Sequence, residues 1–256
     1  MTEVTWDYTR LAHSYADRPD YAAGAVDTVL ELADARPGDL ACDIGAGSGH
    51  LTLPLLDRGL LVDAVEPNDE MRAVGSRRTA ERAGVHWFDG TAERTGRADG
   101  RYRLATFGSS FNVADPALTL PETARILAED AWFACLWNHR DLTDPLQAGI
   151  EEVIHRHLPE YSYGARRADQ SATIAGSGLF GPVQTITGTV LHRVDTETWC
   201  AAWHSHATLA RQAGDRFERI VAEIGDLVRA SAGPVLEVPY TTRGWVAQLL
   251  PAAARP

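Results

Sequence analysis

The chain has 256 residues, of which 35 are acidic and 24 are basic, so its formal net charge is −11. This length suits one large α/β domain with an elaboration, and the excess of acids argues against a protein that binds the phosphate backbone of nucleic acids. Every basic residue is an arginine, which excludes a catalytic lysine, Schiff-base chemistry and a P-loop lysine.

Short apolar runs alternate with helical patterns up to about residue 140. The pattern predicts helices over 21–35, 48–58, 69–83 and 116–128, and strands over 40–44, 60–65, 85–88, 102–107 and 131–137. Such alternation is typical of βαβ units. It therefore predicts an α/β fold with a doubly wound, Rossmann-like and mostly parallel sheet.

The alternation changes after residue 140. Residues 141–180 show a helical pattern at 147–157 but no clean strand, and we expect them to form a cap inserted over the carboxyl edge of the sheet. A strand over 182–194, helices near 196–210 and 215–230, and an antiparallel final strand within 235–249 complete the expectation. The whole chain, 1–256, is thus expected to be one domain with an N-terminal lid at 1–20 and a substrate cap at 141–180.

A glycine-rich loop follows the first strand of this sheet. Gly45, Gly47 and Gly49 form a G-x-G-x-G pattern, whereas a dinucleotide-binding loop has the pattern G-x-G-x-x-G. Asp43 precedes the loop, and its carboxylate would repel a pyrophosphate but attract an ammonium group. The loop therefore favours a cofactor with a cationic end and no phosphates, and it argues against a nicotinamide-dependent dehydrogenase.

Two further acids follow strand ends. Glu66 ends the second strand, where an acid can accept hydrogen bonds from two ribose hydroxyls. Glu93 closes the loop Gly90-Thr91-Ala92-Glu93, and its carboxylate can accept a hydrogen bond from an exocyclic purine amine. Together the three acids indicate a site for a nucleoside with a cationic tail.

With these residues in place, the sequence resembles the class I S-adenosylmethionine (SAM)-dependent methyltransferases. The resemblance rests on D-I-G-A-G-S-G-H-L-T at 43–52, V-E-P-N-D-E-M-R at 65–72 and G-T-A-E at 90–93. Tyr8, Tyr15, Arg18 and Pro19 near the start, and V-P-Y-T-T at 238–242, resemble a small-molecule, methyltransferase type 11-like branch. The similarity covers nearly the whole chain.

The resemblance implies SAM as the cofactor and assigns roles by position. Asp43 would bind the SAM amino group, Glu66 the ribose hydroxyls, Glu93 the adenine edge and Arg18 the SAM carboxylate. The full implied cofactor set is Tyr15, Arg18, Asp43, Gly45, Ala46, Gly47, Glu66, Pro67, Met71, Thr91, Ala92, Glu93, Gly108 and Ser109. The branch often has His-Trp where this chain has Asn112-Val113, which indicates a differently shaped substrate pocket and leaves no histidine base in that loop.

Other side chains are candidates for the reaction itself. Aromatic faces attract a sulfonium, so Tyr8 and Phe111 are predicted to lie beside the transferred methyl group. The candidates for substrate contact are Tyr161, Tyr163, Arg166, Arg167 and His204. No metal site is expected, because His155 and His157 are spaced i,i+2 and do not share a helix face.

These features favour an enzyme that methylates nitrogen or oxygen of a small molecule, in secondary-metabolite (antibiotic-type) biosynthesis. Two alternatives stay open: a carboxyl O-methyltransferase of a small organic acid, and a SAM-binding protein without methyl transfer. The first ten residues lack a signal-peptide pattern, and the three cysteines have neither metal nor redox spacing, so we expect a cytoplasmic protein. The expected partner is a small molecule, with no nucleic acid and no membrane; a homo-oligomer stays open.

Overall fold

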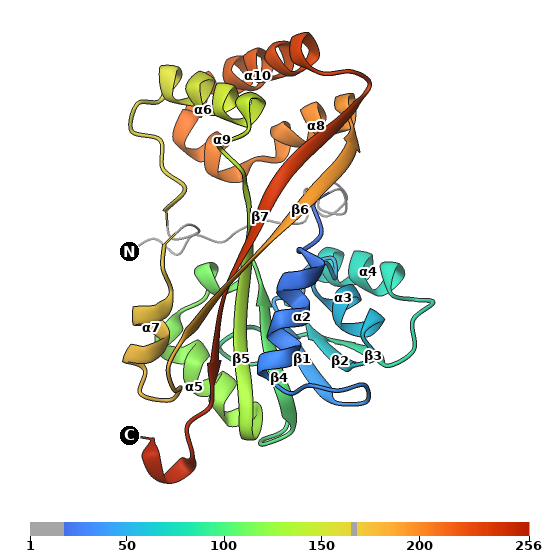
Figure 1. Ribbon diagram of the computed structural model, residues 1–256, viewed down its shortest axis with the longest axis vertical. Helices are drawn as coiled ribbons and strands as arrows, with labels where there is room; N and C mark the ends of the chain where they lie inside the picture. Colours follow the sequence, from blue (N-terminus) through green and yellow to red (C-terminus); the bar gives the residue numbers. More distant parts are fainter. Residues whose placement is uncertain (1–17, 165–167, 256) are drawn as a thin grey trace.

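The computed structural model describes residues 18–164 and 168–255. Its centre is a seven-stranded sheet with the order β3-β2-β1-β4-β5-β7-β6 (Figure 1). The strands are β1 (Leu40–Ile44), β2 (Leu61–Val65), β3 (Val85–Phe88), β4 (Tyr102–Gly108), β5 (Leu127–Arg140), β6 (Gln184–Asp195) and β7 (Val235–Gln248). The strands β1 to β5 pair in parallel, and β7 pairs antiparallel with both β5 and β6. The predicted fold class is therefore confirmed.

Helices cover both faces of the parallel half. On one face α2 (Ala23–Leu32) and α3 (Thr52–Asp57) bury a cluster that includes Val26 and Leu55. On the other face α5 (Pro116–Ile126) and the short α7 (Ser171–Gly176) bury Leu120 and Ile174 in a second cluster. Helix α4 (Asp69–Arg78) follows β2 and packs beside β3. Because apolar residues line both faces, the sheet is a rigid platform for the loops at its carboxyl edge.

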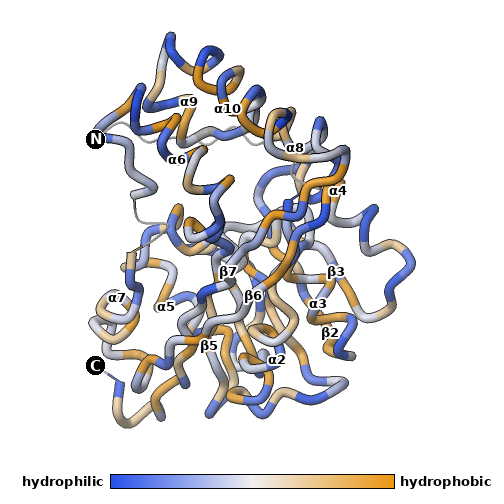
Figure 2. Tube along the Cα trace, turned by 45° about the horizontal axis from the view of Figure 1, so that its top comes forward, coloured by the Kyte–Doolittle hydropathy of each residue, from blue (hydrophilic) through white to orange (hydrophobic). Residues whose placement is uncertain are grey.

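A group of helices stands beyond that edge (Figure 1). It contains α6 (Pro145–His157), α8 (Thr196–Ala202), the 3-10 helix η4 (Trp203–Ser205), α9 (Ala207–Ala213) and α10 (Phe217–Ser231). These elements share a third apolar cluster, to which Ile150, Trp199 and Ile224 belong. Figure 2 shows the apolar residues of α10 alternating with polar ones along the helix, as expected when only one side is buried. We call this group the cap.

The cap differs from the predicted one in its boundaries. Helix α6 lies inside the predicted span 141–180. Near the end of that span, however, Ile174 and Phe180 belong to the core of the main sheet. Helices α8 to α10, between β6 and β7, complete the cap instead. The reason is that β5, β6 and β7 are long and extend past the other strands. The segment that follows β5 and the segment that joins β6 to β7 therefore lie at the same end of the molecule (Figure 1).

Within the described part of the chain, no helix combines the length and the apolar character needed to span a membrane.

Candidate active site

A cavity of about 620 Å³ lies between the carboxyl edge of the sheet and the cap. Its lower compartment is formed by the loops after β1 to β4 and is lined by Asp43, Gly45, Ala46, Gly47, Ser48, His50, Leu51, Glu66, Pro67, Asn68, Met71, Thr91, Ala92, Glu93, Gly108, Ser109, Ser110, Val113 and Ala114. Its upper compartment is lined by Trp137, Asn138, His139, Arg140, Tyr163, His192, Trp199, Ala202, Trp203, His206 and Tyr240. Arg18, Pro19 and Tyr21, before α2, complete the lining.

The glycine loop is shaped by close backbone approach. Gly45, Gly47 and Gly49 all have left-handed φ angles, of 66°, 57° and 83°. A Cβ atom at Gly45 would lie 2.5 Å from Cβ of Ser110, whose hydroxyl donates to the carbonyl of Ile44 at 2.6 Å. Only glycine fits there, because both the φ angle and the contact exclude a side chain. The loop therefore exposes bare backbone to the lower compartment.

Asp43 is fully buried beneath this loop. Thr52 donates to its Oδ2 at 2.6 Å and Thr106 donates to its Oδ1 at 3.0 Å. Burial raises the pKa of Asp43 to about 6; the two threonine hydrogen bonds oppose the shift, and the nearby Glu66 carboxylate adds to it. An ionised carboxylate in such a place gains from a cationic group in the cavity.

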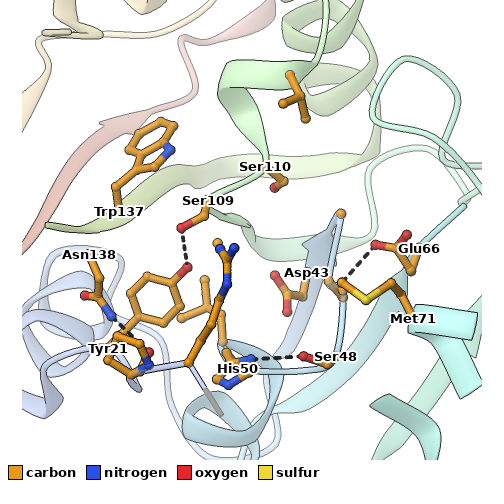
Figure 3. A pocket seen from close by; sticks show the side chains of 18 of the residues that line it. Tyr21, Asp43, Ser48, His50, Glu66, Met71, Ser109, Ser110, Trp137 and Asn138 are labelled. Carbon is orange, nitrogen blue, oxygen red and sulfur yellow. Dashed lines mark hydrogen bonds between the residues drawn. The ribbon is translucent and has the colours of Figure 1, made fainter. Parts of the chain in front are cut away.

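Glu66 forms the opposite wall of the lower compartment (Figure 3). Its Oε2 accepts from the amide of Gly47 at 2.8 Å and its Oε1 accepts from the amide of Asn68 at 2.9 Å. Burial raises its pKa, although these backbone donors and Arg72 oppose the shift. Each carboxylate oxygen has a second lone pair, so Glu66 can still accept from a pair of ligand hydroxyls.

The segment before α2 is tied to the sheet beside the cavity. Nδ2 of Asn138 donates to the carbonyls of Pro19 at 3.1 Å and Asp20 at 2.9 Å. Thr242 donates to Oδ1 of Asn138 at 2.5 Å and accepts from the amide of Ala22 at 2.8 Å. These four bonds hold the backbone next to Arg18 at the cavity wall.

The end of β4 is also tightly constrained. Ser109 has a φ of 58°, rare for a residue with a side chain, and its hydroxyl lies 3.0 Å from the Tyr21 hydroxyl (Figure 3). In the next turn Asn112 accepts from the indole N–H of Trp137 at 2.8 Å. Asn112, where the resembling branch often has histidine, therefore orients a tryptophan of the upper compartment. The left-handed backbone of Ser109 is the kind of strain that is concentrated at functional sites.

Most predicted cofactor residues meet in this cavity. Its lining contains Arg18, Asp43, Gly45, Ala46, Gly47, Glu66, Pro67, Met71, Thr91, Ala92, Glu93, Gly108 and Ser109 from the cofactor set, and Tyr163 from the substrate set. The carboxylate of Glu93 also accepts from the amide of Asp115 at 3.0 Å. The predicted residues Tyr8, Tyr15, Arg166 and Arg167 lie outside the described residues.

Three predicted residues lie elsewhere. Phe111 is 1% exposed and packs its ring against Phe107 and Phe133, because it points back into the sheet core. Tyr161 packs inside the cap core, and its ring lies edge-on to that of Tyr163. The exposed His204 lies 3.3 Å from Glu218, outside the cavity lining. These predictions are wrong as to position.

Sequence reasoning missed most of the upper compartment. We expected β5 to end at Trp137, yet it runs to Arg140 and brings Asn138 and His139 into the lining. The sequence did contain a signal for Asn138 and His139, because they are polar residues that follow a buried parallel strand. The carboxyl ends of such strands meet at the ligand-binding edge of the sheet. No local signal could have placed His192 and His206 there. The pairing of β6 with β7 positions His192 and the cap packing positions His206, and both are non-local.

Known proteins are similar to both the sequence and the fold. Residues 41–130 match the family model described as a methyltransferase domain. This part of the chain thus matches a methyltransferase domain, in agreement with the predicted resemblance to class I SAM-dependent methyltransferases. The match confirms the predicted family resemblance, and with it SAM as the cofactor. The cavity fits that cofactor, because bare glycine backbone, a buried carboxylate and a strand-end glutamate line its lower compartment.

Individual relatives extend the comparison. An uncharacterized methyltransferase of Mycobacterium bovis is 35% identical over 124 residues, which are 48% of this chain and 48% of that protein. The chain thus spans about half the length of this curated relative. A ribosomal RNA small subunit methyltransferase A of Pseudomonas syringae is 24% identical over 77% of this chain and 74% of its own. The solved structure of a putative type II methyltransferase from Anaeromyxobacter dehalogenans shares the fold, with a TM-score of 0.73, 21% identity and coverage of 91% of this chain and 99% of that one.

Proposed function

We propose that this protein transfers the methyl group of SAM to a nitrogen or oxygen atom of a small molecule, in secondary-metabolite (antibiotic-type) biosynthesis in the cytoplasm. One observation carries the proposal. A single cavity joins the acidic lower compartment, which suits SAM, to an upper compartment roofed by the cap. A roofed cavity suits a small acceptor better than a polymer, which needs an open groove.

In methyl transfer, the main task of the protein is to align the acceptor atom with the methyl group. When bound, SAM supplies a methyl group activated by a sulfonium. The residues around the cavity would hold an acceptor nitrogen or oxygen in line with that methyl group. Holding the two reactants in this geometry can lower the barrier by roughly 7–11 kcal/mol. The glycine loop, Glu66 and the segment fixed by Asn138 would hold one reactant, and the cap would hold the other.

A proton must leave if the acceptor arrives protonated. His139, His192 and His206 line the upper compartment, and histidine exchanges protons near neutral pH. Nδ1 of His206 accepts from the amide of Leu209 at 3.2 Å, so a neutral His206 carries its proton on Nε2. Because the one acceptor nitrogen of His206 is thus engaged, we propose that His139 or His192 takes up the proton, which would add about 10²–10⁴-fold to the rate.

Two alternatives are separated by one experiment. The purified protein is titrated with S-adenosylhomocysteine by calorimetry and then incubated with isotope-labelled SAM and a panel of amines, phenols, alcohols and carboxylic acids. Labelled N- or O-methyl products support the proposal, and labelled esters alone support the carboxyl methyltransferase. Binding without any product supports a SAM-binding protein without transfer. Absence of S-adenosylhomocysteine binding would reject the proposal.

A further inference from the structure

The upper compartment contains a buried arginine that the proposed reaction does not use. The side chain of Arg140, the last residue of β5, is 8% exposed and lines the cavity. Nη1 donates to Oε1 of Gln147 at 3.0 Å, and Nη2 donates to Oε1 of Glu151 at 2.5 Å and to the hydroxyl of Tyr163 at 2.7 Å. The guanidinium also lies 4.8 Å from the ring centre of Trp203. Arg140 thereby connects the sheet to the cap.

This network leaves hydrogen-bond donors available. An arginine carries five N–H donors. To the residues that the structure describes, Arg140 donates through Nη1 and Nη2 only, and its Nε–H has no acceptor there. The remaining N–H groups of this cavity-lining arginine can therefore donate to an oxygen atom of a ligand.

The charge of Arg140 is already balanced. Glu151 is a buried carboxylate at 2.5 Å, and it also accepts from the Tyr163 hydroxyl. A ligand carboxylate would be the second anion beside one cation and would meet repulsion from Glu151. A neutral carbonyl or hydroxyl oxygen accepts the same hydrogen bond without that repulsion.

Flat aromatic rings form much of the remaining wall. The rings of Trp199 and Trp203 meet edge-on, with 5.6 Å between their centroids. The ring of His206 stacks on that of Trp203, with 5.1 Å between the centroids and an interplanar angle of 11°. Trp137 is fixed by its bond to Asn112 and by Trp245, 5.5 Å away. Walls that are rigid before binding favour a ligand of matching shape, here a planar apolar body.

From these observations we propose that the upper compartment binds an uncharged, planar aromatic acceptor whose carbonyl or hydroxyl oxygen accepts a hydrogen bond from Arg140. This inference rests on the proposed function, in that it identifies the acceptor class of the same cavity.

The first test uses the full-length protein saturated with S-adenosylhomocysteine. Binding of 2-acetylnaphthalene, 2-naphthoate and 2-acetyldecalin is measured by calorimetry. The planar neutral ketone is expected to bind about tenfold or more tightly than the carboxylate and than the non-planar ketone, about 1.4 kcal/mol or more in each comparison. Naphthoate binding as tightly as the aromatic ketone would overturn the assignment of a neutral ligand, and equal binding of the two ketones would overturn the assignment of a planar one.

The second test changes the charge balance. Glu151→Gln keeps an oxygen that can accept from Arg140 but removes the negative charge, so naphthoate should gain about tenfold while the aromatic ketone changes by less than about threefold. Glu152→Gln, at an exposed position next to it on α6, is the matched control and should change neither. An unchanged preference in Glu151→Gln would contradict the role of the charge pair. If that variant does not fold, the wild-type comparison of ketone and carboxylate still decides.

The two proposals fail in distinguishable ways. Absence of S-adenosylhomocysteine binding, measured before the probes are added, would reject the proposed function. Normal S-adenosylhomocysteine binding with no preference among the probes would reject only the acceptor class.

Discussion

Asp43 gives the cofactor site a pH dependence that can be measured. Its pKa is raised to about 6 by burial, so in the free protein it is ionised above that pH and protonated below it. In the proposed binding mode the ionised form attracts the ligand's ammonium group, so the affinity for S-adenosylhomocysteine should be nearly constant at a pH well above 6. It should then fall by up to about tenfold per pH unit as the pH drops further.

Calorimetric titrations between pH 5 and 8.5 test this expectation. Asp43→Asn should bind at least about tenfold more weakly at pH 8 and lose most of the dependence near pH 6. Some dependence should remain, because burial also raises the pKa of Glu66. An affinity of wild type that does not change across pH 6 would contradict the role of Asp43.

Gly45 and Ser110 give a second prediction at the scale of single residues. Gly45→Ala places a Cβ 2.5 Å from that of Ser110 at a φ of 66°, and should lower the free energy of unfolding by about 2–4 kcal/mol. The double variant Gly45→Ala/Ser110→Gly removes the clash but not the φ strain. It is compared with Ser110→Gly alone, which loses the hydrogen bond to the Ile44 carbonyl, and in that background Gly45→Ala should cost about half as much. Gly24→Ala, where an added Cβ meets nothing within 4 Å, is the control and should be neutral or slightly stabilising. Urea denaturation measures all of these variants, and an equal cost of Gly45→Ala with Ser110 and with Gly at position 110 would contradict the clash.

The residues that sequence reasoning identified share one property. Asp43 is the penultimate residue of β1, Glu66 directly follows β2 and Glu93 lies in the loop after β3. A local motif marks such positions because the chain must turn where the ligand binds. Phe111 was misplaced because an aromatic residue after a strand can point either to the ligand or to the core. Only the packing against Phe107 and Phe133 decides between them.

At the scale of elements, the segment entering α2 is held by β5 and β7 together. Asn138→Asp keeps the bond from Thr242 but cannot donate to the carbonyls of Pro19 and Asp20. If this segment positions Arg18 for the SAM carboxylate, the affinity for S-adenosylhomocysteine should fall by about tenfold, with a stability loss of about 1–3 kcal/mol.

A second ligand separates positioning from general damage. Adenosine lacks the carboxylate, so its affinity should change little in Asn138→Asp, and equal losses for both ligands would contradict the positioning role. Thr187→Ala, at an exposed position on β6, is the control for a substitution in this part of the sheet and should affect neither ligand.

The strands of the parallel half were predictable, but the composition of the cap was not. Alternating apolar runs identify β1 to β5 because each strand carries its own apolar signal. The joining of α6 with α8, α9 and α10 depends on contacts between residues such as Ile150 and Ile224, which lie far apart in the chain. Such contacts leave no local pattern, since an amphipathic helix shows that one side is buried but not what covers it.

At the scale of the whole molecule, charge bears on the choice of partner. One relative is a ribosomal RNA methyltransferase, yet this chain has a net charge of −11, and many surface arginines pair with acids, as Arg58 does with Asp27 and Arg156 with Glu223. Binding to RNA without sequence preference requires a basic surface that displaces counterions, and it typically gives dissociation constants of about 10⁻⁴–10⁻⁶ M.

We therefore expect no RNA binding even at low salt, where electrostatic attraction is strongest. Fluorescence anisotropy of a labelled RNA hairpin at about 50 mM NaCl should show no saturable change up to about 100 μM protein, whereas an arginine-rich peptide, as positive control, should bind and lose affinity as salt is added. Salt-sensitive binding by this protein in the micromolar range would contradict the prediction. Without such binding, the acidic surface and the roofed cavity favour the same conclusion, that the acceptor is a free small molecule.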